Sequence, residues 1–190
     1  MQTHALEGGF SDAPVAAARA FRTAMRVMAR PGTIEALDGA ARPPAPASAA
    51  AGTLLLTLCD PDTGVHLAGA HDAPALRDWI AFHTGAPVAA PDAAQFALGS
   101  WEALMPLSQY GLGTPEYPDR SATLIVEMAA LTTEGTALYG PGIRDRAELS
   151  LPDAQGMREN AARFPLGLDF LLTCGGRVAA LPRSTRLEDA

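Results

Sequence analysis

Apolar residues near the start of the chain recur every three or four positions, which is the period of an amphipathic helix. This apolar stripe consists of Val15, Ala18, Phe21, Met25 and Met28. Ser11-Asp12-Ala13-Pro14 supplies a capping side chain and a first-turn proline, and Pro31-Gly32 ends the pattern. We therefore predict a helix between these two signals, with the apolar stripe facing the core. Four arginines fall off the stripe and are expected to face solvent, with a functional anion site as the alternative: Arg19, Arg22, Arg26 and Arg30.

Further along the chain, short apolar runs alternate with helical patterns. Helices are predicted over 49–59, 72–83 and 152–163, with a helical turn after Ser100. Strands are predicted over 33–37, 65–68, 95–98, 121–131, 169–174 and 177–181, and another strand ends at Tyr139. Glu134-Gly135 is expected to turn the 121–131 strand into the one that ends at Tyr139. Gly175-Gly176 predicts a hairpin with positive φ at both glycines. This alternation predicts a mixed α/β fold with at least one antiparallel pair.

The chain of 190 residues is expected to form a single domain over 1–190. Residues 1–11 are predicted to be a flexible N-terminal tail. The Ala- and Pro-rich stretch 38–51 is predicted to be an internal loop, because only about 40 residues precede it, too few for a separate core. The stretch 111–118, rich in glycine and proline, is predicted to be a further loop.

The composition of the chain argues against several classes of protein. Apolar residues make up 48% and charged residues 18% of the chain, which excludes a disordered chain. The net charge of −7 argues against nonspecific nucleic-acid binding, which needs a basic face. Cys59 and Cys174 lie far apart, as in a reduced cytosolic protein. No basic segment followed by an apolar run opens the chain, and no apolar run approaches about 20 residues. We therefore expect a cytoplasmic protein that does not enter a membrane.

All fourteen basic side chains are arginines, and the sequence contains no lysine. A Schiff base with pyridoxal phosphate needs a lysine amine, so this cofactor cannot be held covalently, and we expect no cofactor. The histidines stand at positions 4, 66, 71 and 83, without the spacing of a metal site, so we expect no metal. Asp72, next to His71, is interpreted as a helix cap.

Two places could still carry binding chemistry. His83 ends a predicted helix, where it could act as a base or be held by backbone carbonyls. The segment 181–186 brings Arg183 and the hydroxyl of Thr185 just past a strand, where a guanidinium could hold a phosphate or a carboxylate of a partner. Arg183 is expected at the sheet edge where open α/β sheets bind ligands, and Arg183→Ala is expected to leave the fold intact.

Several sequence blocks, taken in order, resemble one family. The first are Phe21-Arg22, Arg30-Pro31-Gly32, Leu54-Leu55-Leu56-Thr57-Leu58 and Phe82-His83-Thr84-Gly85-Ala86-Pro87. The later ones are Gly113-Thr114-Pro115-Glu116, Gly140-Pro141-Gly142-Ile143, Phe164-Pro165-Leu166-Gly167-Leu168-Asp169 and Leu181-Pro182-Arg183-Ser184-Thr185. Together they are similar to the PhnH family, a subunit of the bacterial carbon–phosphorus lyase system for phosphonate breakdown. Glu116, which lies in one of these blocks, joins His83, Arg183 and Thr185 as a candidate for binding a ligand or partner.

The resemblance implies a three-layer α/β/α fold with a mixed sheet, like the domain of pyridoxal-phosphate-dependent transferases but without the cofactor. It also implies a homodimer within a core complex with the G, I and J subunits, joined by an ATP-binding L subunit. That assembly is associated with displacing adenine from ATP by a phosphonate, which gives a ribose 1-phosphonate 5-triphosphate. The family offers no established catalytic residue to place on this chain.

Two functions stay open at this point. The first is an assembly or supporting subunit without a complete active site, which the acidic charge and the missing nucleophile favour. The second is a component that binds phosphonate or nucleotide directly through a site around His83 and Arg183. An acidic chain repels such polyanions unless its arginines cluster locally. An independent hydrolase has no motif in its support.

Overall fold

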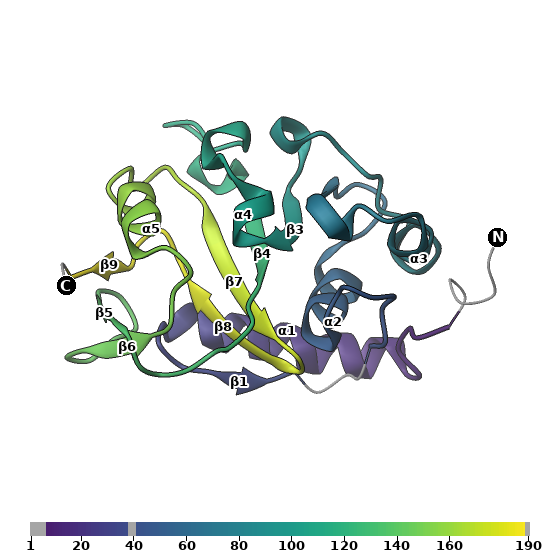
Figure 1. Ribbon diagram of the computed structural model, residues 1–190, viewed down its shortest axis with the longest axis horizontal. Coiled ribbons are helices and arrows are strands. Elements are labelled where there is room, and N and C mark those ends of the chain that lie inside the picture. The colour runs from purple at the N-terminus through teal and green to yellow at the C-terminus, as the bar shows by residue number, and fades with distance from the viewer. Residues whose placement is uncertain (1–6, 38–40, 189–190) are drawn as a thin grey trace.

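A six-stranded mixed sheet runs through the middle of the computed structural model, which describes residues 7–37 and 41–188 (Figure 1). The strand order is β1-β8-β7-β4-β3-β2. The strands are β1 (Glu35–Ala36), β2 (Val65–Leu67), β3 (Phe96–Ser100), β4 (Thr123–Glu127), β7 (Asp169–Cys174) and β8 (Arg177–Leu181). Strands β2, β3, β4 and β7 are parallel, whereas β8 runs antiparallel to β7 and to β1.

Both faces of this sheet are buried. Along β4, Ile125 belongs to a first core cluster, and Leu124 and Val126 belong to a second one on the opposite face, as the two-residue period of a strand requires. The first cluster packs under three helices: α1 (Ala13–Ala29), α2 (Ala49–Leu58) and α3 (Pro74–Thr84). The second packs under α4 (Trp101–Leu104), α5 (Ala154–Ala161) and a small second sheet. The α/β class and the mixed sheet are confirmed.

The second sheet has the order β6-β5-β9 and is antiparallel. Its strands are β5 (Thr136–Tyr139), β6 (Ala147–Leu149) and β9 (Arg186–Leu187). The strand that ends at Tyr139 is thus present as β5, but it belongs to a different sheet from β4 and pairs with β6 and β9. The links between these elements contain short 3₁₀ turns: η2 (Gly69–His71), η3 (Pro91–Ala93), η4 (Leu107–Gln109) and η5 (Pro118–Arg120). No helix in the described ranges is long and apolar enough to cross a membrane.

Helix α1 begins and ends where the sequence predicts, with the Asp12 side chain accepting from the backbone N–H of Val15. The predicted buried face is wrong. Val15, Phe21 and Met25 are 44%, 48% and 53% exposed. The side chains that α1 buries are Ala20, Thr23, Ala24 and Val27. The buried face of α1 is made of small residues because these let the helix approach the alanines at the start of α2 closely. The larger side chains therefore point outward.

Two smaller predictions also fail. Asp72 does not cap α3, whose N-cap is Ala73 without a side-chain hydrogen bond; Asp72 forms an ion pair with Arg77 instead. In the turn between β7 and β8, Gly175 has a φ of 61°, but Gly176 is not in the left-handed region, so only one glycine is needed for its conformation. Gly85 does end α3 in the left-handed conformation, with a φ of 72°.

The N-terminal segment packs against α3 from Glu7 onward. The Glu7 carbonyl accepts hydrogen bonds from Trp79 Nε1 at 2.9 Å and from His83 Nε2 at 3.3 Å. Phe10 packs against the first core cluster. Residues 1–6 of the predicted tail and 38–40 of the predicted loop lie outside the described residues. The rest of that loop leads into α2, which already begins at Ala49.

Candidate functional site

The carboxyl edge of the parallel strands is where open α/β sheets bind ligands. Three chain segments bring polar side chains to this edge. His71 lies in η2, directly after β2; Glu127 ends β4; and Thr173 stands opposite Glu127 in the register of β4 and β7. Ser48, the N-cap of α2, reaches the same place through its backbone.

The carboxylate of Glu127 is fully engaged by the chain itself. Its Oε1 accepts from the backbone N–H of Ser48 at 2.6 Å, and its Oε2 accepts from the Thr173 hydroxyl at 3.1 Å. The carboxylate therefore sits at the start of α2, where the helix dipole favours a negative charge. An external phosphate would have to displace Glu127 to occupy the same position.

His71 is buried, with 6% of its surface exposed, and its Nε2 has no hydrogen-bond partner among the described residues. Burial lowers the pKa of His71, while the charge of Glu127 and a hydrogen bond to the Ala68 backbone act in the opposite direction. The ring is therefore neutral at pH 7, with one nitrogen free to accept or donate a proton. His71 thus brings a buried nitrogen without a hydrogen-bond partner among the described residues to the carboxyl edge.

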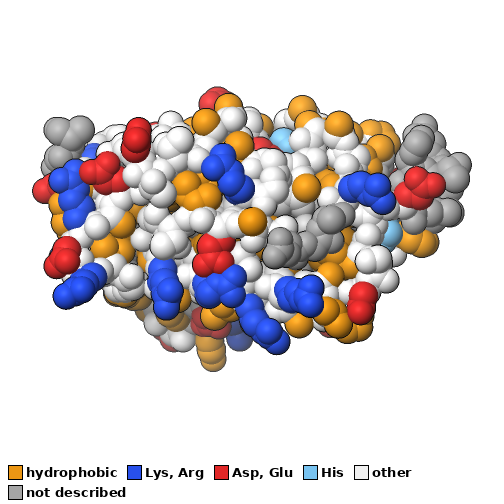
Figure 2. Space-filling model, turned by 90° about the horizontal axis from the view of Figure 1, so that it is seen from below, with side chains coloured by type: hydrophobic (Ala, Val, Ile, Leu, Met, Phe, Trp, Pro, Cys, Tyr) orange, Lys and Arg blue, Asp and Glu red, His pale blue; other side chains and the backbone are white. Residues whose placement is uncertain are grey.

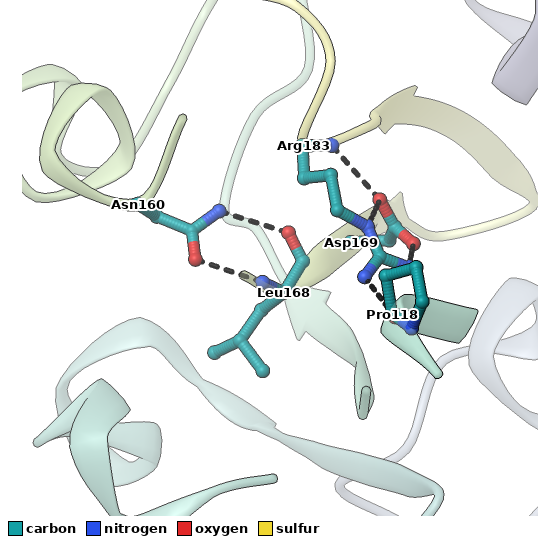
Figure 3. Close-up of polar contacts among 5 residues, drawn as sticks. All are labelled: Pro118, Asn160, Leu168, Asp169 and Arg183. Atoms are coloured by element: carbon teal, nitrogen blue, oxygen red, sulfur yellow. Dashed lines mark hydrogen bonds and ion pairs between the residues drawn. The ribbon is translucent and has the colours of Figure 1, made fainter. Parts of the chain in front are cut away.

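Arg183 lies at the opposite edge of the sheet. Because β8 is antiparallel to β7, the end of β8 lies beside the start of β7, at the amino ends of the parallel strands. The guanidinium donates to both carboxylate oxygens of Asp169, from Nε at 3.2 Å and from Nη2 at 2.7 Å (Figure 3). Nη1 donates to the Pro118 carbonyl at 2.6 Å, and the Arg183 backbone N–H donates to Asp169 at 2.8 Å.

These contacts correct two expectations about Arg183. The residue does not lie at the ligand-binding edge, since the hairpin of β7 and β8 reverses the chain direction. Its side chain and that of Asp169 are 15% and 13% exposed, and they tie together β7, the link after β8 and η5. Arg183→Ala is therefore expected to weaken the fold, in contrast to the expectation from sequence.

A second set of internal hydrogen bonds, between Asn160 and Leu168, lies beside this ion pair, and we call it the Asn160 bracket. The buried amide of Asn160 donates from Nδ2 to the Leu168 carbonyl at 2.8 Å and accepts from the Leu168 N–H at 2.8 Å (Figure 3). It thereby satisfies both backbone groups of a fully buried residue that lies just before β7. Asn160 and Arg183 together fix the position at which β7 begins.

The structure does not bring the four candidate residues into one place. His83 ends α3, between the rings of Trp79 and Phe82, far from the link between β8 and β9 that holds Arg183 (Figure 1). Thr185 is buried, and its Oγ1 has no hydrogen-bond partner among the described residues. Glu116 is exposed in the loop before η5. A composite site of His83 and Arg183 is therefore not formed within this chain.

Surface hollows were compared as possible polyanion sites. A hollow of about 180 Å³ beside Met105, Leu112 and Asn160 is smaller than the usual ligand pocket of roughly 300–1,000 Å³. The largest of five hollows on the described surface has about 530 Å³ and is lined by Asp92 and Asp119 together with Arg120. In none of the five hollows compared on the described surface do arginines outnumber carboxylates. None offers the positive lining that a nucleotide or phosphonate requires.

Groups of three or more metal-ligating side chains are also not found within residues 7–37 and 41–188. Cys59 is buried, and burial raises the pKa of its thiol to about 12, so the thiolate that binds metals is not populated at neutral pH.

The cluster of His71, Glu127 and Thr173 was missed in the sequence analysis. The sequence pattern favours Asp72, next to His71, as a helix cap and predicts Glu127 inside a strand of eleven residues rather than at its end. The sequence signal for this cluster is the position of its polar residues at the ends of predicted strands, because the carboxyl ends of parallel strands lie at the same edge of the sheet. Reading the ends of the predicted strands would have placed His71 and Glu127 together.

Comparison with known proteins gives two relatives. In an alignment of 196 positions, the chain is 44% identical to a Rhizobium meliloti protein named alpha-D-ribose 1-methylphosphonate 5-triphosphate synthase subunit PhnH, with 98% of both chains covered. It is 32% identical over 111 residues to a Stutzerimonas stutzeri protein named putative C-P lyase subunit protein HtxG, which covers 55% of this chain and 56% of the other.

The family model described as bacterial phosphonate metabolism protein (PhnH) matches residues 8–188. These residues include every helix and strand of both sheets. The match thus confirms the family that the ordered sequence blocks indicate. The chain belongs to the PhnH family of bacterial phosphonate metabolism proteins.

Proposed function

We propose that this chain is a supporting subunit of an alpha-D-ribose 1-methylphosphonate 5-triphosphate synthase in a bacterial carbon–phosphorus lyase system. The observation that carries the proposal is the 44% identity, over 98% of both chains, to a protein named as a subunit of that synthase. The synthase transfers the ribose triphosphate of ATP to a phosphonate and releases adenine. This chain contributes to the assembly in which that transfer occurs.

The supporting role follows from how the chain uses its own charges. Glu127 is held by Ser48 and Thr173, and Arg183 is held by Asp169 and Pro118. None of the five hollows compared on the described surface has a positive lining. A direct binding role through His83 and Arg183 loses support, because these residues lie in separate parts of the molecule.

The finer points of the proposal concern partners and cofactors. The partners are the G, I and J subunits, with the ATP-binding L subunit, and the chain pairs with a second copy of itself as a homodimer in the cytoplasm. The likeness to a pyridoxal-phosphate-dependent transferase domain remains a prediction. A covalently held pyridoxal phosphate is excluded chemically by the lysine-free sequence.

Co-expression tests the proposal. The chain, carrying the single affinity tag, is expressed with untagged G, I and J subunits from the same organism and purified. We expect the three subunits to elute with it in fixed stoichiometry after size-exclusion chromatography. Recovery of the tagged chain alone would contradict the subunit role.

A further inference from the structure

The outward side of α1 is the largest feature that the proposed function does not use. We define the α1 outer face as Val15, Ala18, Phe21 and Met25 together with Arg19, Arg22, Arg26 and Arg30. All eight side chains are exposed. Phe21 and Met25, at 48% and 53%, are among the most exposed large apolar residues of the described chain. Exposed apolar groups that form one stripe mark an interaction surface more often than single ones do.

The face has an ordered arrangement. At about 100° per residue, the positions 18, 21 and 25 form one row along the helix, and 19, 22, 26 and 30 form the row beside it. An apolar stripe is thus flanked on one side by a line of guanidinium groups. Figure 2, which views the molecule from the side on which α1 lies, shows arginines interspersed with apolar side chains.

The charge of this face is opposite to that of the chain. Residues 13–30 contain four of the fourteen arginines and no acidic residue, whereas all 21 acidic residues lie elsewhere. Among the ion pairs of the described residues, Arg26 is the one member of the row that takes part, with Glu35 at 2.5 Å. Arg19 and Arg22 form no ion pair with any described residue.

Two occupants fit this face poorly. In a two-fold dimer the same patch meets itself near the axis, so a second copy would bring one arginine row against the other. A nucleotide or phosphonate binds in a concave pocket, whereas the outer side of an exposed helix is convex. A protein surface with apolar positions beside a line of carboxylates matches both rows.

We propose that the α1 outer face docks this chain onto another subunit of the synthase, at an acidic surface of that subunit with apolar positions for Phe21 and Met25. This proposal rests on the proposed function, because it names the surface through which the supporting subunit joins the assembly. Phe, Met and Arg are residue types that interfaces enrich, and Asp and Glu, which α1 lacks, are types that interfaces deplete.

The test compares two double variants with two matched controls in the co-expression experiment. Phe21→Ser with Met25→Ser removes the apolar row, and Arg19→Glu with Arg22→Glu reverses half of the charged row. The controls change exposed residues elsewhere: Phe82→Ser on α3, and Arg144→Glu with its side chain 97% exposed. Circular dichroism and thermal unfolding of each purified chain establish that the fold is kept.

Both α1 variants are expected to reduce the co-purified partner subunits by at least about tenfold, while both controls keep them. The wild-type complex is expected to weaken as NaCl is raised, since salt screens the arginine row. Folded α1 variants that keep their partners would overturn the docking proposal and leave the subunit role intact. Wild-type chain that recovers no partner would instead overturn the proposed function.

Sedimentation of the isolated chains tests separately whether a second copy of this chain covers the α1 outer face. A wild-type dimer that the α1 variants convert to monomers would show that the face is covered by a second copy, which contradicts docking onto another subunit. A dimer that persists in all four variants, or a monomer in all of them, supports the proposal that this face is reserved for another chain.

Discussion

The two edges of the six-stranded sheet each hold one charged residue against internal partners, but they do so to different degrees. At the amino edge, all three nitrogens of the Arg183 guanidinium donate within the chain. At the carboxyl edge, Glu127 is equally engaged, yet His71 Nε2 is left without a partner among the described residues. The Arg183–Asp169 pair is therefore a structural latch whose charges are fully paired, whereas the carboxyl edge holds a buried ionisable ring with one unpaired nitrogen. Near the latch, the buried hydroxyl of Thr185 also lacks a partner among the described residues.

Because the charges of Arg183 and Glu127 are both paired within the chain, they stabilise the fold and are not available to bind a ligand. Arg19 and Arg22, which form no ion pair with any described residue, lie instead on the outside of α1. In an acidic protein of this family, positive charge is concentrated on one helix, and that location favours contacts with another subunit over binding of a small anion.

The largest effect is expected at the latch. Arg183→Ala leaves the Asp169 carboxylate largely buried without its cation, which should lower the free energy of unfolding by about 2–4 kcal/mol. Urea unfolding of the purified variant measures this change. The control is Arg177→Ala, an exposed arginine at the start of β8, which should change stability by less than about 0.5 kcal/mol. Equal stabilities of the two variants would show that the latch is not a stabilising element.

The bracket of Asn160 is expected to rank second. Asn160→Ala leaves the N–H and the carbonyl of the fully buried Leu168 unpaired, at a cost of about 2 kcal/mol in unfolding free energy. Gln155→Ala, on the exposed side of the same helix, serves as the control. The same urea titration compares them, and an Asn160→Ala chain as stable as the control would contradict the bracket.

Glu127→Gln tests the carboxyl edge. The amide still accepts one hydrogen bond but loses the negative charge at the start of α2, so a loss of about 1 kcal/mol is expected. Thermal unfolding of Glu127→Gln beside Glu102→Gln, an exposed glutamate on α4, measures the difference. A variant that is more stable than the wild type would mean that the carboxylate is strained rather than satisfied.

The smallest effect concerns pH. Because burial lowers the pKa of His71 in the folded chain below its ordinary value of 6.5, the unfolded chain binds this proton first as the pH falls. The free energy of unfolding should therefore decrease as the pH drops below 6.5. His71→Gln should flatten this decrease between pH 7 and pH 5 by less than about 1 kcal/mol. Identical pH profiles of both proteins would rule out this contribution.

The sequence predicts the local elements well where the signals are local. The ends of α1, the Gly85 cap and the β7–β8 hairpin follow from capping residues and glycines within a few positions. The buried face of α1 could not be predicted by picking the largest apolar side chains, because packing on α2 favours Ala20 and Ala24. Strands β6 and β9 are too short to show a period, and only their pairing with β5 defines them.

The sequence likewise predicts some features of the candidate site, while others depend on the fold. Arg183 is found easily as a charged residue after a strand, but its partner depends on β8 being antiparallel, which the sequence alone suggests only through the hairpin. Glu127 and His71 are separated by more than fifty residues, and only the parallel order of β2, β3 and β4 brings them to one edge.

The central claim is that this chain supports an assembly and binds no substrate of its own. Calorimetric titration of the full-length chain with ATP, and separately with methylphosphonate, tests it most directly. We expect no saturable heat with either ligand up to about 1 mM, because the charges at both sheet edges are satisfied internally and the five hollows compared on the described surface lack a positive lining. Stoichiometric binding of ATP with a Kd below about 100 μM would contradict this account.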